Sequence, residues 1–294
     1  MSIKIITRQN YASSTVVGEL MDRFDFGGYF NCLKTVFTGQ KLLFHDETTS
    51  TFHMIESFMD TNGFTTVANV QTAGRGRTSN KWTSHRGCAM FCNVLHVDLE
   101  SFLGQRISFL QMLMSLAIVK GIKKLLGGHD IGLRLKWPND IYYGRETKVG
   151  GIIVTSLIQG NKAICCFGSG INVDNLEPTN CINNIIRHSN LQDKKQLTTG
   201  QVIGASLTEL ESMVNNFRNE DDWRRIKKAY LDSWLHQDQK VTTADSTKAI
   251  IREINDYGFL VLEEEETHQI ITAQPDGNRF DLLQNLLILR ETEN

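Results

Sequence analysis

The sequence lacks the features of membrane-spanning, secreted and general nucleic-acid-binding proteins. None of its apolar runs reaches the roughly 18–20 residues that a helix needs to cross a bilayer. Its 31 basic residues nearly balance its 33 acidic residues, for a formal net charge of −2, so no general affinity for nucleic acid or membrane surfaces is expected. No continuous apolar core of a secretory signal precedes Glu19. We therefore expect a cytoplasmic protein. The basic residues Lys4 and Arg8 are also compatible with a mitochondrial pool of the protein.

Several common site signatures are also missing. The six cysteines form no C-x-x-C pair and mostly lie in apolar stretches, so we interpret them as reduced core thiols, with metal binding by Cys88 and Cys92 as the minor alternative. The phosphate-binding pattern GxxxxGK[S/T] does not occur, and Gly168-Ser169-Gly170 is not followed by the third glycine of a dinucleotide-binding loop. No spacing indicates a Ser/His/Asp or Cys/His nucleophile, so a covalent enzyme intermediate is not predicted.

What the chain does have is the length and the periodicity of an α+β protein. Its 294 residues, 40% of them apolar, suffice for two domains or for one large domain with an appendage. The pattern predicts a lead-in segment over 1–40, a main domain over 41–236 and a small β-rich domain over 237–294. Strands are expected at 41–45, 65–70, 88–99, 131–137, 152–158 and 163–167, helices at 29–37, from 51 onward, 105–126, 200–217 and 221–235, and a long loop at 174–198.

Three polar clusters stand next to expected strands, where side chains from different strands converge on one ligand. They are Gly74–Arg77, Lys136–Asp140 with Lys148, and Gly168–Asn172. Taken alone, the Gly/Arg run is equally well explained as a solvated turn. Together the clusters offer Arg75, Arg77, Lys136 and Lys148 against the single carboxylate of Asp140, which indicates a strongly anionic ligand. Asp140 is a candidate Mg²⁺ ligand, because Mg²⁺ prefers carboxylate, water and phosphate oxygens.

The same clusters, in this order and spacing, resemble the motif set of biotin–protein ligases. The resemblance is carried by Gly74-Arg75-Gly76-Arg77 with Trp82, Lys136-Trp137-Pro138-Asn139-Asp140, Lys148-Val149-Gly150-Gly151-Ile152 and Gly170-Ile171-Asn172. Leu103–Ile107, the stretch 133–143 and Pro275–Asn278 are similar to the eukaryotic holocarboxylase synthetase type. The likeness extends over roughly residues 24–290. It implies a mixed β-sheet flanked by helices, of the class II synthetase-like type, and a small C-terminal SH3-like β-barrel.

The implied activity is a two-step ligase reaction. Biotin would be activated with MgATP to biotinyl-5′-AMP, and the biotinyl group would pass to a specific lysine of a biotin-acceptor domain in a carboxylase, with release of AMP. The implied partners are biotin, ATP with Mg²⁺, and these acceptor domains, without nucleic acid or membrane. The resemblance is compatible with a monomer and with a dimer, so it does not give the oligomeric state.

The resemblance also implies roles for single residues. Arg75, Arg77 and Lys148 would act on the biotin carboxylate and the phosphates. Biotin would be bound by Ser50, Thr51, Phe52, Gln71, Gly74, Arg75, Gly76, Arg77, Lys148 and Gly151, where Gly151 leaves room for the bicyclic ring. ATP would be bound by Lys136, Asn139, Asp140 and Asn172, with Asp140 next to Mg²⁺. An ion pair would explain Lys136 about as well as ATP binding does, and a position in the core would explain Trp82 about as well as a place in the site.

The chain departs from the family pattern at two positions. Thr78-Ser79-Asn80 stands where many bacterial members continue the loop with Gly and Arg, and Ser169 replaces the small apolar residue often found between two glycines. Forty N-terminal residues do not supply the DNA-binding domain of bifunctional bacterial members. Two other functions remain as alternatives: a lipoate or octanoyl ligase or transferase of the same fold, and a non-enzymatic sensor of biotin or biotinyl-AMP.

Overall fold

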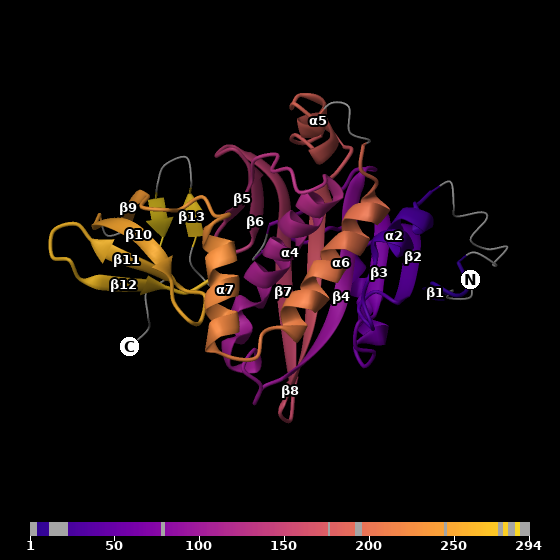
Figure 1. Cartoon of the computed structure of the whole chain (residues 1–294), viewed down its shortest axis with the longest axis horizontal. Coiled ribbons are helices and arrows are strands. Elements are labelled where there is room, and N and C mark those ends of the chain that lie inside the picture. The colour runs from indigo at the N-terminus through magenta and orange to yellow at the C-terminus, as the bar shows by residue number, and fades with distance from the viewer. Residues whose placement is uncertain are drawn as a thin grey trace.

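The computed structural model describes residues 5–11, 23–77, 80–175, 177–191, 196–243, 246–275, 279–281 and 286–288. The main body is built on an eight-stranded mixed sheet with the order β1-β2-β3-β4-β8-β7-β6-β5 (Figure 1). Its strands are β1 (Ile5–Thr7), β2 (Lys41–Thr48), β3 (Thr65–Gln71), β4 (Cys88–Asp98), β5 (Leu133–Lys136), β6 (Asp140–Tyr143), β7 (Thr147–Gln159) and β8 (Lys162–Asn172). The pair β2–β3 is parallel and the other neighbours are antiparallel.

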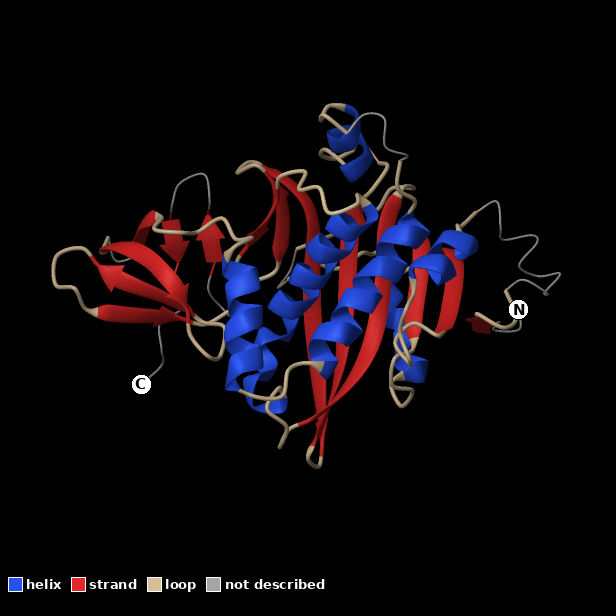
Figure 2. Ribbon diagram, in the orientation of Figure 1, coloured by secondary structure: helices blue, strands red, loops and turns tan. Residues whose placement is uncertain are grey.

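A layer of helices covers one face of this sheet (Figure 2). It consists of α2 (Phe26–Cys32), α4 (Leu110–Leu125), α6 (Thr199–Asn215) and α7 (Glu220–Leu231), while α5 (Ile182–Arg187) lies at one end of the sheet (Figure 1). The large apolar core lies between this layer and the sheet. On the opposite face, the short helix α3 (Thr51–Ile55) packs over a smaller core that includes Cys92 and Cys166. The predicted mixed sheet flanked by helices is thus confirmed.

A second sheet of six strands lies beside the main body, on the side where β5 and β6 form the edge of the main sheet (Figure 1). Its order is β12-β11-β10-β9-β14-β13. The strands are β9 (Lys240–Thr243), β10 (Lys248–Ile254), β11 (Leu260–Glu264), β12 (Ile270–Ala273), β13 (Arg279–Asp281) and β14 (Leu286–Ile288). This sheet is consistent with the predicted SH3-like domain. The predicted boundary at 236/237 falls between α7 and β9, and the division into domains stays a prediction.

The predicted elements differ from the structure in several places: the strands β1 and β6 were not predicted, β7 begins at Thr147 rather than at 152, and four further differences follow. The first helix begins at Phe26 and ends at Cys32, rather than running from 29 to 37. The expected helix over 105–126 begins as a 3₁₀ segment, Gly104–Phe109, before α4. The expected loop over 174–198 contains α5, whose apolar side chains at 182, 185 and 186 are buried. The cluster Gly168–Asn172 does not follow a strand but forms the last part of β8, because neighbouring strands pair with it throughout.

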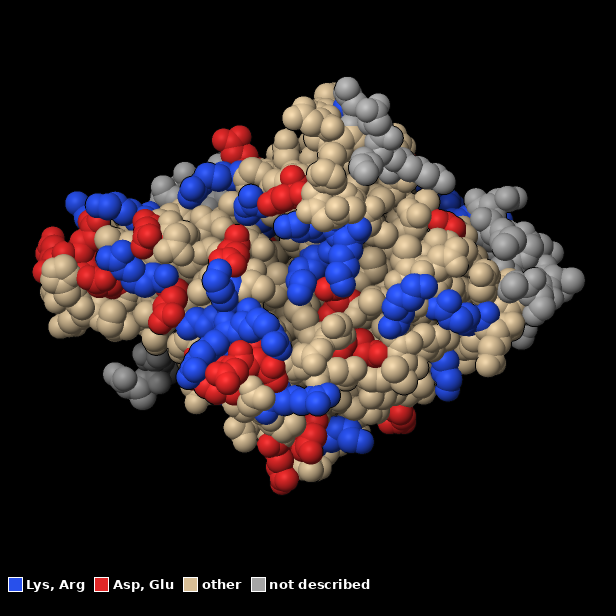
Figure 3. Space-filling model, viewed as in Figure 1, with Lys and Arg blue, Asp and Glu red and all other residues tan. Residues whose placement is uncertain are grey.

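Acidic and basic side chains are interspersed on the face shown in Figure 3. Within the described residues, no helix is long and apolar enough to cross a membrane.

Two glycines of α6 bring α2 into direct contact with it. A Cβ atom on Gly200 would lie 2.2 Å from the carbonyl oxygen of Asp25, and one on Gly204 would lie 2.3 Å from that of Tyr29. These are backbone atoms, which cannot rotate away as a side chain can. The close contact lets Tyr29, which is fully buried, donate its hydroxyl hydrogen to the carbonyl of Gly39 at 2.8 Å.

We predict that Gly204→Ala lowers the free energy of unfolding by about 1–2 kcal/mol. Separating the two helices costs about 1–3 kcal/mol, which exceeds the roughly 1 kcal/mol that alanine gains over glycine in a helix. Urea unfolding measures the difference, with Ser212→Ala on the exposed side of the same helix as the control. A Gly204→Ala protein as stable as the wild type would contradict this packing.

Candidate active site

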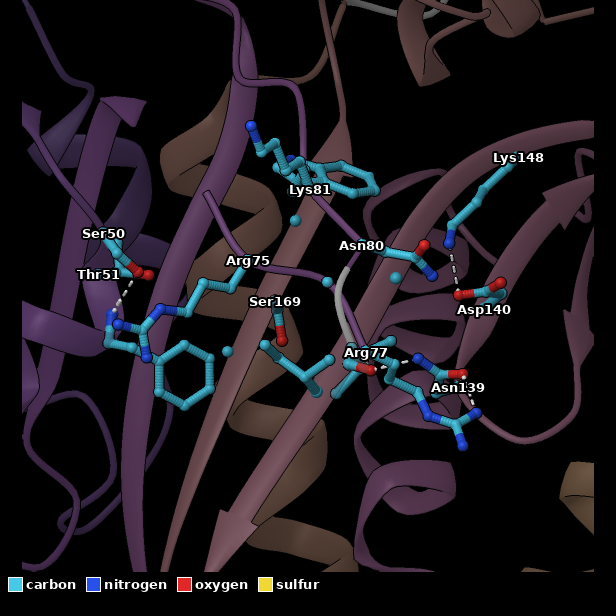
Figure 4. Close-up of a pocket in the computed structure, with 18 of the residues that line it drawn as sticks. Ser50, Thr51, Arg75, Arg77, Asn80, Lys81, Asn139, Asp140, Lys148 and Ser169 are labelled. Atoms are coloured by element: carbon cyan, nitrogen blue, oxygen red, sulfur yellow. Dashed lines mark hydrogen bonds and ion pairs between the residues drawn. The ribbon is translucent and has the colours of Figure 1, made fainter. Parts of the chain in front are cut away.

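A cavity of about 470 Å³ opens on the face of the sheet that carries α3. It is lined by side chains and backbone from α3, β3, the Gly/Arg loop, the β5–β6 turn, the first half of β7 and the second half of β8 (Figure 4). Twelve of the predicted site residues meet here: Ser50, Thr51, Phe52, Gln71, Arg75, Gly76, Arg77, Lys136, Asn139, Asp140, Lys148 and Gly151. Three segments that are far apart in the sequence therefore form one site.

One end of the cavity is built around the start of α3. Ser50 caps this helix, since its hydroxyl accepts a hydrogen bond from the backbone N–H of Phe52 at 3.2 Å. The side-chain oxygen of Gln71, on β3, accepts from the backbone N–H of Thr51 at 2.8 Å and from its hydroxyl at 3.0 Å. These bonds fix the orientation of the Gln71 amide. The result is a row of small polar groups beside the ring of Phe52.

Glycines of β8 let two aromatic rings rest directly on its backbone. A Cβ atom on Gly168 would lie 2.0 Å from Cε2 of Phe52, and one on Gly170 would lie 2.6 Å from Cε2 of Trp82. Trp82 is half-buried and lines the cavity, so its side chain belongs to the wall of the site rather than to the core. The floor of the cavity between the two rings is therefore backbone.

The Gly/Arg loop folds back on itself as a short ribbon. The backbone N–H of Trp82 donates to the carbonyl of Gly74 at 3.0 Å, and that of Gly76 donates to the carbonyl of Asn80 at 2.8 Å. Between these pairs, Arg75 and Lys81 form an antiparallel bridge. The loop is thus ordered by its own backbone and lines the cavity, unlike a solvated turn. Thr78 and Ser79, where the sequence departs from the family pattern, lie outside the described residues.

The two arginines of the loop lie differently. The side chain of Arg75 is exposed at the cavity (Figure 4). Arg77 donates to the side-chain oxygen of Asn139 at 3.3 Å and to the carbonyl of Pro275. Arg77 therefore connects the loop both to the β5–β6 turn and to the second sheet.

The β5–β6 turn presents the second cluster. The backbones of Lys136 and Asp140 are register partners across a tight hairpin. The strand ends before Pro138, as predicted, because proline cannot donate a hydrogen bond to a neighbouring strand. The buried amide of Asn139 donates to the carbonyl of Ile152 at 2.6 Å while its oxygen accepts from Arg77. Lys136 lies over the ring of Tyr142, at 5.3 Å from its centroid. The turn, the loop and β7 are thereby joined into one unit.

Lys148 and Asp140 form the ion pair at the centre of this unit. The ammonium of Lys148 lies 2.7 Å from the nearer carboxylate oxygen of Asp140 and 5.8 Å from the centroid of Trp82. A Cβ atom on Gly151 would lie 3.1 Å from that carboxylate oxygen and 3.3 Å from the ammonium. The ion pair therefore lies directly beside Gly151, and the role of Gly151 in making room for a ligand ring stays a prediction.

The charge of the cavity is strongly positive. Among its described lining residues, one carboxylate, Asp140, stands against five cations: Arg75, Arg77, Lys81, Lys136 and Lys148. Lys81 was not predicted, although its pairing with Arg75 follows from the ribbon form of the loop. An anionic ligand is favoured here, since it offsets the mutual repulsion of the cations.

Two predicted site residues do not line the cavity. Gly74 is buried where a Cβ atom would lie 2.5 Å from the carbonyl oxygen of Trp82, so it permits the ribbon to close. Asn172 is also buried, and its amide donates to the hydroxyl of Thr179 at 2.9 Å and accepts from Asn175 at 2.9 Å. Its amide holds the segment after β8 in place. The sequence placed Asn172 next to a glycine-rich stretch but gave no sign of these partners.

A buried histidine outside the cavity supports the β5–β6 turn. Nε2 of His236 accepts from the backbone N–H of Trp137 at 3.0 Å, and its Nδ1 lies 3.0 Å from the side-chain oxygen of Gln239. Burial lowers the pKa of His236 to about 4, because the protonated ring would be charged in an apolar setting. The side chain is 0% exposed, so the ring stays neutral at neutral pH. The sequence indicated only a domain boundary at 236/237 here.

Comparison with known proteins places the chain in a family. The family model described as "Biotin/lipoate A/B protein ligase family" matches residues 45–172, which include all of the described residues that line the cavity. Residues 45–172 thus carry the domain of this family.

Within the family, the chain is most informatively compared with biotin–protein ligases. It is 36% identical to the human "Biotin--protein ligase" over 276 residues, which cover 91% of this chain and 38% of the human protein. It is 35% identical to the Schizosaccharomyces pombe protein of the same name, over 78% of this chain and 40% of that protein. The chain thus spans about two fifths of the length of these relatives.

Solved structures share the fold. Biotin protein ligase from Aquifex aeolicus in complex with biotin and ATP superposes with a TM-score of 0.62 at 21% identity, over 80% of this chain and 96% of that one. The Leishmania major biotin protein ligase in complex with biotinyl-5-AMP gives a TM-score of 0.53 at 21% identity, over 79% and 97% of the two chains. The predicted fold class is confirmed by this similarity.

We predict that His236 makes the protein less stable as the pH falls from 6.5 towards 4. In this window the unfolded chain binds a proton at His236 and the folded chain does not, so unfolding takes up a proton and the free energy of unfolding falls by up to about 1.4 kcal/mol per pH unit. Urea unfolding between pH 7 and 5 measures this slope.

His236→Gln removes the titrating group, so its slope should be smaller than that of the wild type. His129→Gln, at an exposed position, should keep the wild-type slope. Equal slopes for wild type and His236→Gln would contradict the neutral buried ring.

Proposed function

We propose that this chain is an ATP-dependent biotin–protein ligase, which activates biotin with MgATP and transfers it to a lysine of a biotin-acceptor domain in a carboxylase. The observation that carries the proposal is the cavity, where a small polar end next to Phe52 adjoins a region with five cations and one carboxylate. The names of the relatives and the ligands in the structures of the same fold support it.

The first step brings two anions together. A carboxylate oxygen of biotin attacks the α-phosphorus of ATP, the bond to the β-phosphate oxygen breaks, and pyrophosphate leaves. Two unit charges 4 Å apart repel by about 4 kcal/mol near a protein surface, so the cations must offset several kcal/mol for the attack to occur. Arg75 and Arg77 are placed to hold the carboxylate and the phosphates, since a guanidinium can bond two oxygens at once.

The second step releases AMP. The neutral amine of an acceptor lysine attacks the carbonyl carbon of biotinyl-5′-AMP, the bond to the phosphate oxygen breaks so that AMP leaves, and one of the two protons on the attacking nitrogen passes to solvent, leaving an amide N–H. Negative charge develops on the carbonyl and phosphate oxygens. Lys148 lies on the side of the cavity where both groups would meet, so it stabilises charge in both steps.

The remaining lining residues divide between the two substrates. The hydroxyls and amide of Ser50, Thr51 and Gln71 would bond the ureido ring of biotin, and Phe52 would contact its hydrocarbon part. Lys136 and Asn139, on the β5–β6 turn, would lie on the ATP side. Asn172, assigned to ATP from the sequence, would act only through the segment that it holds.

Asp140 is the carboxylate that would meet the Mg²⁺ carried in with ATP. Mg²⁺ bound to a nucleotide keeps several waters and takes one or two protein carboxylates, so a single Asp fits this need. Within the described residues, no group of three or more His, Cys, Asp or Glu side chains could hold a metal by itself. The ion would share Asp140 with Lys148.

The wider assignments follow the sequence expectations. The acceptor would be a carboxylase domain, the protein a monomer or a dimer, and the compartment the cytoplasm. The six cysteines are free thiols, five of them buried, which supports a reducing compartment.

The decisive experiment follows labelled biotin into an isolated biotin-acceptor domain in the presence of MgATP, with AMP measured in parallel. Label should appear only when ATP and the acceptor lysine are both present. Incorporation of lipoate instead of biotin would overturn the proposal in favour of the lipoate branch of the family. Tight binding of biotinyl-5′-AMP without transfer would indicate a sensor.

We expect Lys148→Ala to slow both half-reactions by about 100- to 1000-fold, because an ammonium aimed at developing charge is lost. The side chain is 37% exposed at the cavity, so the fold should survive its removal. Pyrophosphate exchange and single-turnover transfer measure the two steps separately. Lys162→Ala, at an exposed position on β8, is the control and should behave as the wild type. Loss of the circular dichroism signal in Lys148→Ala would point to a structural role instead.

Gly168→Ala should weaken biotin binding about tenfold while the KM for MgATP changes little. The added methyl group collides with Phe52 and forces the ring into the biotin end of the cavity, where overpacking costs about 1–3 kcal/mol. Calorimetric titration with biotin measures the affinity. Gly27→Ala, whose nearest neighbour would lie 3.7 Å from the new carbon, serves as the control. Unchanged biotin affinity would show that the ring has another way out.

A further inference from the structure

The β5–β6 turn is held from outside the cavity by residues that follow the main sheet in the sequence. The backbone N–H of Trp137 donates to Nε2 of His236 at 3.0 Å, and its indole N–H donates to the carbonyl of Gly258 at 2.9 Å. Trp137 is 1% exposed and His236 0%. His236 lies in the connection between α7 and β9, and Gly258 lies between β10 and β11. Both partners of the turn therefore come from the region that joins and forms the second sheet.

The contact determines which ring nitrogen of His236 carries the proton. A backbone N–H can only donate, so Nε2, which faces Trp137, must be the unprotonated acceptor. In the neutral ring the hydrogen is then on Nδ1 and is donated to the side-chain oxygen of Gln239. The backbone carbonyl of Gln239 in turn accepts from Ile251 on β10 at 2.9 Å. A chain of hydrogen bonds thus runs from the second sheet to the turn.

The turn carries one side of the cavity. Two residues after Trp137, the side chain of Asn139 forms hydrogen bonds with Arg77 and Ile152. The next residue, Asp140, forms the ion pair with Lys148. The biotin end is anchored separately, through the bonds of Thr51 to Gln71. A displacement of the turn would therefore change the nucleotide side of the cavity most, reach the biotin carboxylate only through Arg77 and Lys148, and leave the end beside Thr51 and Gln71 in place.

We propose that His236 is a positioning residue: through its hydrogen bond to Trp137 it fixes the turn that presents Asn139 and Asp140, and so it sets the affinity for MgATP more than the affinity for biotin. This assignment rests on the proposed function. His236 itself does not line the cavity, and it acts only through the turn.

Two substitutions at the same position separate this role from general support of the fold. Glutamine places its side-chain oxygen near the position of Nε2, so His236→Gln keeps an acceptor for Trp137. Asparagine reaches only the position of Nδ1, so His236→Asn leaves the buried N–H of Trp137 without a partner, and the turn is no longer held in the position that binds MgATP. His129→Asn, at an exposed position, is the matched control.

The test uses the full chain of each variant. Calorimetry gives the Kd for biotin without ATP, and pyrophosphate exchange gives kcat and KM for MgATP. His236→Asn should raise the KM for MgATP about tenfold and the Kd for biotin by a smaller factor, whereas His236→Gln should stay within about threefold of the wild type in both. Equal behaviour of the two variants, or a parallel loss of biotin affinity, would overturn the proposal.

Two further measurements cover the remaining outcomes. Should His236→Asn fail to fold, Gln239→Leu removes the acceptor for Nδ1–H that holds the ring in the orientation facing Trp137, so the ring can turn away, and an unchanged KM for MgATP there would overturn the proposal. Amide hydrogen exchange at Trp137 needs no ligand. It should be slow in the wild type and in His236→Gln, and fast exchange in the wild type would refute the positioning contact. A wild type that exchanges slowly at Trp137 but shows no biotin-dependent pyrophosphate exchange would instead contradict the proposed function.

Discussion

Like charges repel, and the structure around the cavity holds five cationic side chains close together. Three of them have partners that restrain them: Lys148 has its ion pair with Asp140, Lys136 the ring of Tyr142, and Arg77 its bonds to Asn139 and Pro275, while Arg75 and Lys81 lie on a ribbon whose backbones pair. The fold therefore offsets part of the repulsion in advance. A site preorganised in this way loses little further energy by reorganisation when an anionic substrate arrives.

Much of the fold was predictable because its signals are local. The alternation of β4, the apolar run of α4 and the cap at Ser50 each follow from a few neighbouring residues. Helix α5 was missed because its six residues are too few to show a clear period within an Asn-rich segment. The extension of β8 through two glycines was missed because glycine disfavours strands in general, whereas here Phe52 and Trp82 cover the bare backbone.

Most residues of the site were predictable from the sequence, but the contacts between them were not. The three clusters could be recognised by order and spacing, and the structure brings them together. Their partners are distant in the sequence, however, and no local pattern reveals them. The bond between Trp137 and His236 spans 99 positions, and that between Arg77 and Pro275 spans 198. Such contacts depend on how the second sheet docks, which the sequence alone does not give.

The backbone floor of the cavity has a consequence for how such a protein can change. At Gly168 and Gly170, β8 offers no side chain to the ligand, and any larger residue would displace a wall ring. Substitution can therefore reshape the site from its walls, which are α3, the ribbon, the β5–β6 turn and the first part of β7, without crowding the floor. New ligand preferences would arise from changes in these walls, while the depth of the site would stay the same.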